Sequence, residues 1–295
     1  MITHAEIFGA LGINISKNIA FGQLGLANCS EANTLTFCDD KNYVSVINEN
    51  DNILGVFCTP EIGIQIENSK ELIAVDDPRW YFYTLYNYVA RKNYTKIPTV
   101  IDKSAKIHET AFVSDYNVII GKHVMIGPNS TILPDVIVND NCRIGASSVL
   151  GCDDLEIKDT SRGLLKVFHD GKVKLSSDVS IGCNCTITKG FFNQDTTVGS
   201  GSFVSNNSFI GHRVQIGVNS LILACIICGS AKIGNNVRIN PGAVVSNQIN
   251  IGDNASVTLG SVVVKDVEQN KKVTGNFAIE HNWFMYKYYK IFGSK

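Results

Sequence analysis

Three histidines lie among small, aliphatic and turn-forming residues, where a titratable ring is unusual: His108, His123 and His212. His212 follows Gly211, and Asn206 and Asn207 precede it by one short strand, so we expect its imidazole on a turn, projecting outward. A neutral imidazole suits the removal of a proton from an attacking nucleophile near pH 7. On its type alone His212 is either such a base or a solvated turn histidine, and the other two are interpreted as solvated or structural.

A metal site is not expected from these residues. Three imidazoles would have to converge on one ion, and the three histidines lie in different segments without paired spacing. The nine cysteines are scattered, and the close pairs Cys225/Cys228 and Cys183/Cys185 have no second pair or spaced histidine nearby. We interpret them as reduced packing residues of a cytoplasmic protein.

A second group of candidates lies near the N-terminus. Phe37 and Tyr43 bracket Asp39, Asp40 and Lys41. Two aromatic rings and a lysine suit stacking on a nucleobase and pairing with a phosphate. The spacing alone favours the plainer interpretation, an ordinary strand phenylalanine and a half-buried tyrosine.

The elements that must position these residues follow from a repeat. An aliphatic residue recurs at every sixth position in three runs: Ile120, Ile126, Ile132, Val138, Ile144 and Leu150; Val198, Val204, Ile210, Ile216 and Ile222; Ile227, Ile233, Ile239, Val245, Ile251, Val257 and Val263. A period of six suits a short strand plus a tight turn, three of which make one triangular coil. Asn129, Asn236 and Asn254 suit the turns. The repeat therefore predicts a mainly β protein, a left-handed parallel β-helix whose aliphatic residues point inward and stack from coil to coil.

Three domains are expected from where the repeat begins and ends. Residues 1–97 lack it and read as a small α/β domain, with a helix that opens at Pro78 and has an aromatic face. Residues 98–267 form the β-helix, interrupted at 152–179 by an excursion of hairpins. Residues 268–295 form a packed C-terminal helical tail.

The composition excludes several functions. Charged residues make up 18% of the chain and the formal net charge is -1, which gives no electrostatic footprint for nucleic acid or an anionic membrane. No stretch approaches the ~18 uncharged apolar residues that a membrane span needs. The start of the chain has no basic run leading into an apolar core, so we expect no signal peptide.

Several segments resemble one known family, the UDP-3-O-(3-hydroxyacyl)glucosamine N-acyltransferases of lipid A synthesis. LTFCDDKNYVSVI resembles the family segment whose aromatic residues sandwich uracil, and IGCNCTITKG resembles "IGACTTIDRG". SNNSFIGHRVQIG resembles "DNQCQIAHNVVIG", whose histidine is the general base. The resemblance implies that Phe37 and Tyr43 contact the nucleobase and that His212 is the base.

The chain also departs from the family pattern. The family's "GADGFGY" is here GCDDLEI, its Asp-Arg is here Thr188-Lys189, and a second histidine is missing at Ser246-Asn247-Gln248. A relative that acylates a different amino sugar, for an O-antigen or other surface glycan, therefore fits as well as the lipid A enzyme. The amino sugar, its nucleotide (UDP or dTDP) and the acyl length stay open.

Together these features predict a homotrimeric N-acyltransferase. It would move an acyl group from acyl carrier protein or coenzyme A, as a co-substrate, to the amine of a nucleotide-linked sugar, without a bound cofactor. Lys41, Asn206 and Asn207 would contact the acceptor, and the N–H of Gly211 or Gly229 would hold the oxyanion. Because this fold also serves other tasks, a metal-dependent lyase of the carbonic-anhydrase kind and a non-catalytic scaffold remain alternatives.

Overall fold

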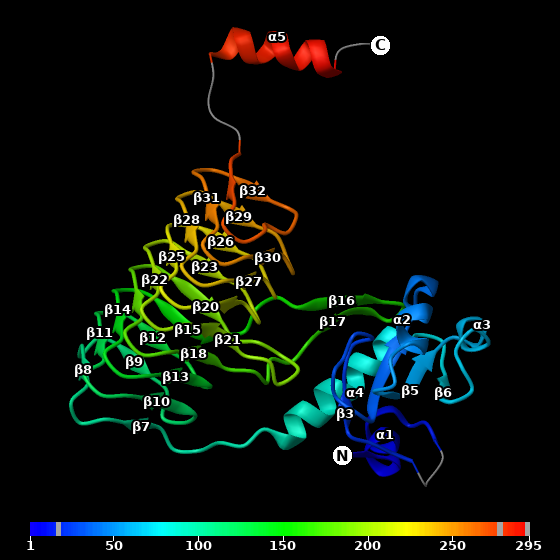
Figure 1. Ribbon diagram of the computed structural model, residues 1–295. Coiled ribbons are helices and arrows are strands. Elements are labelled where there is room, and N and C mark those ends of the chain that lie inside the picture. Colours follow the sequence, from blue (N-terminus) through cyan, green and yellow to red (C-terminus); the bar gives the residue numbers. More distant parts are fainter. Residues whose placement is uncertain (16–18, 276–279, 293–295) are drawn as a thin grey trace.

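The computed structural model describes residues 1–15, 19–275 and 280–292. Figure 1 shows a prism of stacked coils, with a small α/β domain beside its first coils and one helix beyond its last. None of the helices in the described part of the chain combines the length and apolar character of a membrane span.

The prism has three parallel sheets, as the period of six predicted. The first sheet contains β7 (Val100–Ile101), β10 (Val118–Ile120), β13 (Val136–Val138), β18 (Val173–Leu175), β21 (Thr196–Val198), β24 (Gln215–Ile216), β27 (Lys232–Ile233) and β30 (Asn250–Ile251). The second contains β8 (Lys106–Ile107), β11 (Met125–Ile126), β14 (Arg143–Ile144), β19 (Ser180–Ile181), β22 (Phe203–Val204), β25 (Leu221–Ile222), β28 (Arg238–Ile239), β31 (Ser256–Val257) and β33 (Lys272–Val273). The third contains β9 (Phe112–Val113), β12 (Thr131–Ile132), β15 (Val149–Cys152), β20 (Thr186–Thr188), β23 (Phe209–Ile210), β26 (Ile226–Ile227), β29 (Val244–Val245) and β32 (Val262–Val263). The chain forms a left-handed parallel β-helix.

The core of the prism is the aliphatic ladder that the repeat predicted. Every residue of the three runs of period six is buried, and ladder neighbours pair directly, as Ile210 does with Ile227. Asn129, Asn236 and Asn254 adopt positive φ angles of 56°, 54° and 58° at the corners, the left-handed conformation that asparagine tolerates better than most residues.

The N-terminal domain is a four-stranded parallel sheet covered by helices. Its strands are β3 (Gln23–Leu24), β4 (Thr34–Cys38), β5 (Ile53–Cys58) and β6 (Glu71–Ala74), with a separate antiparallel pair, β1 (Ile2–Thr3) and β2 (Ala20–Phe21). Its helices are α1 (His4–Leu11), η1 (Lys41–Tyr43), α2 (Val44–Asn48), α3 (Pro60–Gly63) and α4 (Pro78–Asn93). The Asp77 carboxylate caps α4 by accepting from the Trp80 N–H at 2.9 Å. The buried aromatic residues of α4 include Phe82, Tyr83 and Tyr86, so the predicted aromatic face packs inward.

The excursion is a single hairpin, where two had been predicted. Its strands are β16 (Ile157–Thr160) and β17 (Gly163–Lys166), which pair antiparallel. The second apolar run of this region, Val173–Leu175, instead pairs with Val136–Val138 and Thr196–Val198 in the first sheet. Val173 and Leu175 therefore point into the core, because a coil of the prism needs their buried side chains.

A second outward loop follows β20, and the sequence pattern did not predict it. It carries Phe191 and Phe192, and the Phe192 ring lies 4.4 Å from the Tyr86 ring of α4. This loop and the hairpin together fasten the N-terminal domain to the prism.

The C-terminal part differs from the expected boundary. β33 pairs with β31, so the prism continues past residue 267. The predicted helix is present as α5 (His281–Phe292), which lies beyond the last coil (Figure 1). Its expected packing is wrong for two aromatic residues, because Trp283 and Tyr286 are exposed. Residues 276–279 and 293–295 of the expected tail lie outside the described residues.

Candidate active site

His212 lies at the corner between β23 and β24, on the turn that the sequence predicted. The next residue, Arg213, has a φ of 59°. The alternative of a solvated turn histidine does not hold, because the side chain retains only 15% exposure beneath the base of the excursion. A residue that the coil directs outward is thus covered by a segment inserted elsewhere in the chain.

Asp154 orients the imidazole. Its Oδ2 lies 2.8 Å from His212 Nδ1 and also accepts from the His212 backbone N–H at 3.2 Å. Burial acts to raise the pKa of this carboxyl, but the hydrogen bonds from His212 and from the Leu155 N–H outweigh it and hold the pKa well below its usual range. An ionised Asp154 selects the tautomer with a proton on Nδ1, which leaves Nε2 as the basic nitrogen.

Glu156 is the group nearest to that basic nitrogen. Its Oε2 lies 3.5 Å from His212 Nε2, and its other oxygen pairs with Lys158. The Lys158 ammonium in turn lies 4.9 Å from the centre of the Tyr83 ring. The edge of the imidazole that carries Nε2 therefore faces a carboxylate that Lys158 holds in place.

Gly229 forms the surface beneath the imidazole. A Cβ on this residue would lie 2.3 Å from His212 Nε2 and 2.4 Å from its Cε1, so any side chain here displaces the ring. Among the described residues, no hydrogen bond takes the Gly229 N–H. The expectation for Gly211 is wrong, because its N–H donates to the Ile227 carbonyl at 2.8 Å in the ladder between coils.

His169 stands behind this group, and the sequence pattern did not single it out. It is fully buried, its Nδ1 lies 3.1 Å from the Val167 carbonyl, and its ring centre is 6.1 Å from that of His212. Desolvation lowers the pKa of His169 below its usual value. The centre of the Phe191 ring lies 5.2 Å from that of His212 and 5.6 Å from that of His169. The imidazole of His212 therefore packs against an uncharged imidazole and an aromatic ring.

The N-terminal candidates lie on one edge of the small domain. Phe37 is partly buried, with ring centres of Phe82 and Tyr83 at 4.9 and 5.7 Å, whereas Tyr43 is 53% exposed. Lys41 is exposed at the start of η1. The Tyr43 ring is therefore accessible to a ligand, whereas the Phe37 ring packs against Phe82 and Tyr83.

A path of contacts joins these candidates to the imidazole. Phe37 touches Tyr83, Tyr83 lies under the ammonium of Lys158, and Lys158 pairs with the carboxylate that faces His212. The hairpin strand β16 carries the lysine of this path, so the excursion links the two groups of candidate residues.

Asn206 and Asn207 lie at a different corner, between β22 and β23. The Asn206 side chain accepts from the Cys183 N–H at 2.7 Å, and the Asn207 N–H donates to the Cys183 carbonyl. Asn207 has a φ of 58°. Within the described residues neither is hydrogen-bonded to His212, and both stabilise a corner of the prism; their contact with the acceptor stays a prediction.

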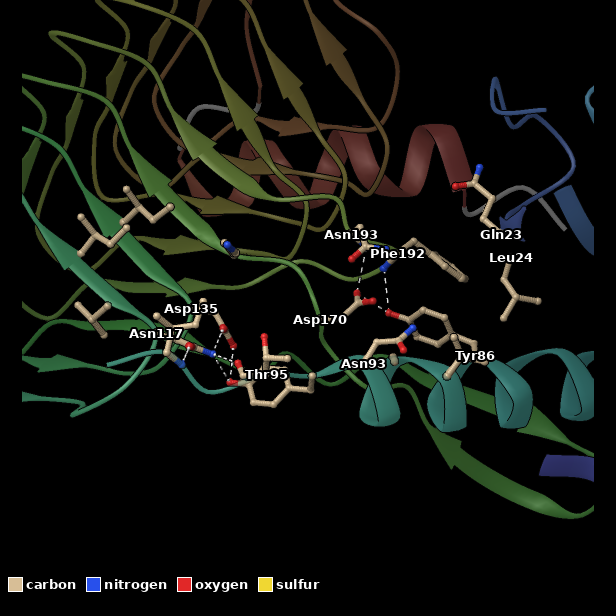
Figure 2. Close-up of a pocket in the computed structure, with 18 of the residues that line it drawn as sticks. Gln23, Leu24, Tyr86, Asn93, Thr95, Asn117, Asp135, Asp170, Phe192 and Asn193 are labelled. Carbon is tan, nitrogen blue, oxygen red and sulfur yellow. Dashed lines mark hydrogen bonds between the residues drawn. The ribbon is translucent and has the colours of Figure 1, made fainter. Parts of the chain in front are cut away.

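One cavity lies apart from His212. It has a volume of about 470 Å³ and lies between α4 and the first sheet, lined in part by Tyr86, Asp135 and Asp170 (Figure 2). The Tyr86 hydroxyl lies 2.6 Å from Asp170 Oδ1 and accepts from the Phe192 N–H. These polar groups are already paired, so the cavity's edge serves to attach the domain to the prism.

The cysteine pairs lie within the packing of the coils. Cys225 is buried, with its sulfur 2.9 Å from the Leu223 carbonyl, and burial raises its pKa to about 11. All nine cysteines are free thiols. In the part of the chain that the structure describes, no group of three His, Cys, Asp or Glu side chains is arranged to hold a metal ion.

Comparisons with known proteins point to one family. Residues 117–152 match the family model described as bacterial transferase hexapeptide (six repeats). The UDP-3-O-acylglucosamine N-acyltransferase of Helicobacter hepaticus is 29% identical over 282 residues, spanning 86% of this chain and 83% of that protein. Its counterpart from Delftia acidovorans is 26% identical, spanning 94% and 87%.

A solved structure supports the fold. The UDP-N-acetylglucosamine acyltransferase of Campylobacter jejuni superposes with a TM-score of 0.51 at 17% identity, covering 67% of this chain and 84% of that one. With the repeat, the coil geometry and the relatives in agreement, the chain is an acyltransferase that is similar to the bacterial hexapeptide-repeat transferases.

Proposed function

We propose that the chain transfers an acyl group from a thioester to the amine of a nucleotide-linked amino sugar, for lipopolysaccharide or another surface glycan. The observation that carries this proposal is the imidazole of His212, oriented by Asp154 at 2.8 Å and lying flat on Gly229. The relatives named UDP-3-O-acylglucosamine N-acyltransferase support the choice of acceptor.

The reaction needs one base and one oxyanion donor. The amine attacks the thioester carbonyl, and His212 Nε2 takes the proton that the nitrogen loses. The N–H of Gly229, free of hydrogen bonds in the described structure, donates to the oxyanion that forms. When the tetrahedral intermediate collapses, the C–S bond breaks, the proton passes from His212 to the thiolate, and the products are an amide and a thiol.

The nucleotide of the acceptor docks on the small domain. Tyr43 stacks on the base with its exposed face, Phe37 supports the other side, and Lys41 pairs with a phosphate. The contact path from Phe37 to Glu156 then leads from the base-binding edge to the imidazole.

The donor is acyl carrier protein or coenzyme A, whose shared phosphopantetheine arm lies along the prism, and no bound cofactor takes part. The free thiols suit a cytoplasmic enzyme. The working form is a homotrimer. In support, the third sheet presents uncharged residues along its whole outer column: Phe112, Thr131, Val149, Thr186, Phe209, Ile226, Val244 and Val262.

The outer columns of the other two sheets contain charged residues, such as Lys174 and Lys232 in the first and Arg143 and Arg238 in the second. An uncharged face of this length is more stable when it is buried against another copy. Val214, which precedes β24, is fully buried in the core and takes no part.

The test is a substrate panel. Purified protein is incubated with UDP- and dTDP-linked amino sugars and with short and long acyl donors, on carrier protein and on coenzyme A. Release of thiol together with an N-acylated sugar nucleotide, identified by mass spectrometry, supports the proposal. Chelator-sensitive hydration of carbon dioxide with stoichiometric zinc would favour the lyase. Absence of both acyl transfer and nucleotide binding would favour the scaffold.

A further inference from the structure

The carboxylate of Glu156 lies where an acceptor amine must arrive. Its Oε2 is 3.5 Å from His212 Nε2. A general base works when the proton-bearing atom lies about 2.6–3.2 Å from it. A nitrogen placed at that distance on this edge of the ring also lies within reach of the Glu156 oxygen.

Glu156 is the acid at this edge that is available to a ligand. Asp154 Oδ2 is already occupied by the Nδ1 and backbone N–H groups of His212. Asp153 faces Lys189, whose ammonium lies 3.5 Å from its Oδ1. Among the acidic side chains of residues 1–15, 19–275 and 280–292, Glu156 is the one that pairs with Nε2, the nitrogen that the tautomer leaves basic.

The position of this carboxylate is fixed by its surroundings. Lys158 pairs with Oε1, which leaves Oε2 directed at the imidazole, and the Tyr83 ring holds the lysine. The other nearby cation, Arg213, has its guanidinium 4.9 Å from the centre of the Phe191 ring. The Glu156 side chain keeps only 17% exposure, so a charge-assisted hydrogen bond here is only weakly screened by water.

The sequence departs from the resembled family at this place. When GCDDLEI is set against "GADGFGY", Asp154 and Glu156 both fall on glycines of the family pattern. Neither carboxylate has a counterpart in that pattern, so the acidic groups at the imidazole edge are a departure from it.

We propose that Glu156 is the ammonium-binding residue of the acceptor site, which rests on the proposed function and extends it. Glu156 Oε2 accepts a hydrogen bond from the protonated amine of the sugar and sets its nitrogen against His212 Nε2. One proton of the ammonium passes to His212 and from there to solvent, which frees the lone pair for attack on the thioester carbonyl and frees the imidazole for the second proton that the nitrogen loses. Glu156 itself stays ionised throughout and selects an amine over a hydroxyl at the reacting carbon.

The experiment compares ligands that differ in this one group. Binding of UDP-glucosamine and of UDP-glucose is measured by calorimetry for the parent and for Glu156→Gln, which keeps the shape and removes the charge. The parent is expected to prefer the amine by at least about tenfold, the strength of a hydrogen bond to a charged group. In Glu156→Gln the preference should fall below about threefold, while UDP-glucose binds as it does to the parent.

Two control variants distinguish ammonium binding by Glu156 from a general effect of charge on the hairpin. Asp159→Asn removes an exposed charge from the same hairpin and should keep the full preference. Lys158→Met breaks the ion pair that fixes the carboxylate but keeps its charge, so the amine preference should weaken and yet stay above that of Glu156→Gln. An unaltered amine preference in Glu156→Gln, or its loss in Asp159→Asn to the same extent, overturns the inference. A parent that acylates amino sugars but binds both ligands equally also overturns it, whereas a parent that acylates none of the UDP- and dTDP-linked amino sugars of the panel refutes the proposed function.

Discussion

Oδ2 of Asp154 accepts two hydrogen bonds from one residue, from Nδ1 of His212 at 2.8 Å and from its backbone N–H at 3.2 Å. The two residues are 58 positions apart in sequence. The contact joins a corner of the prism to the segment that interrupts it, so the excursion orients the imidazole as well as attaching the N-terminal domain.

Replacing Asp154 with asparagine should slow the reaction without weakening substrate binding. The amide keeps its oxygen but not the charge that stabilises the imidazolium formed during proton transfer. We expect kcat to fall by about 10- to 100-fold, part of the 10²–10⁴ that a general base contributes, with KM for the acceptor within about twofold. Steady-state kinetics check this, with Asp159→Asn as the control. An Asp154→Asn enzyme with parental kcat would refute the orienting role.

The same variant should alter the response of stability to acid. Because the folded pKa of Asp154 lies below its unfolded value, near 3.9, the ionised carboxylate stabilises the fold above about pH 4, and this contribution disappears as the pH falls through the folded pKa. Asp154→Asn should therefore be less stable than the parent at pH 7, by a margin that narrows below pH 4. Urea unfolding at pH 7, 5 and 3 measures the margin, and one that stays constant would contradict the argument.

Gly229→Ala should damage catalysis while leaving the fold intact. The three atoms nearest to the new Cβ all belong to the imidazole of His212, and a side chain can move aside. We expect kcat to fall at least about tenfold, since a misplaced base forfeits much of its 10²–10⁴ contribution, with little change in Tm.

Gly211→Ala provides the contrast. Its Cβ would lie 2.8 Å from the Gly229 backbone nitrogen, so the coil itself must shift and Tm should fall. The interpretation of Gly229 as the surface beneath the base fails if Gly229→Ala lowers Tm as much as Gly211→Ala does and keeps its activity.

Charge placed on the third sheet should dissociate the trimer. Ile226 is 46% exposed on the uncharged outer column, and an aspartate buried there without a partner destabilises the assembly by about 3–5 kcal/mol. Light scattering of Ile226→Asp at micromolar concentration should give a monomeric mass. Gln215→Asp, on the outer column of the first sheet, should remain trimeric. A monomeric parent, or dissociation in Gln215→Asp alone, would contradict the assignment.

Tyr43 and Phe37 should respond differently to truncation. Tyr43→Ala should raise KM for the nucleotide sugar by roughly 5- to 100-fold with Tm unchanged, since stacking contributes about 1–3 kcal/mol per base and the ring is exposed. Phe37→Ala should also lower Tm, because its ring packs on Phe82 and Tyr83. If calorimetry finds parental nucleotide affinity in Tyr43→Ala, the small domain has a function other than binding the nucleotide.

The prism could be predicted because its information is local. Ile210 and Ile216 lie one hexapeptide apart in sequence, and the same requirement for a buried aliphatic residue recurs in every coil. Helix α4 was predictable for a similar reason, since Pro78 and the aromatic residues that follow it mark a start and a buried face.

The surroundings of His212 could not be predicted in this way. Asp154, Glu156, His169 and Phe191 come from two irregular segments, whose contacts depend on how those segments fold back over the prism. Nothing in the spacing of these four residues requires the two segments to fold back over the prism. One signal was present: the departure of GCDDLEI from the family pattern falls on the two carboxylates that meet the imidazole.

The most direct test is the rate of His212→Ala with the acceptor that the parent acylates. The variant should keep the trimer and nucleotide affinity, with a lower Tm at pH 7 because the part-buried Asp154 carboxylate loses its hydrogen-bond partner, while kcat falls by about 10²–10⁴, the range for a general base. A His212→Ala enzyme that retains more than about a third of the parent kcat at pH 7, a loss far below that range, would contradict the account.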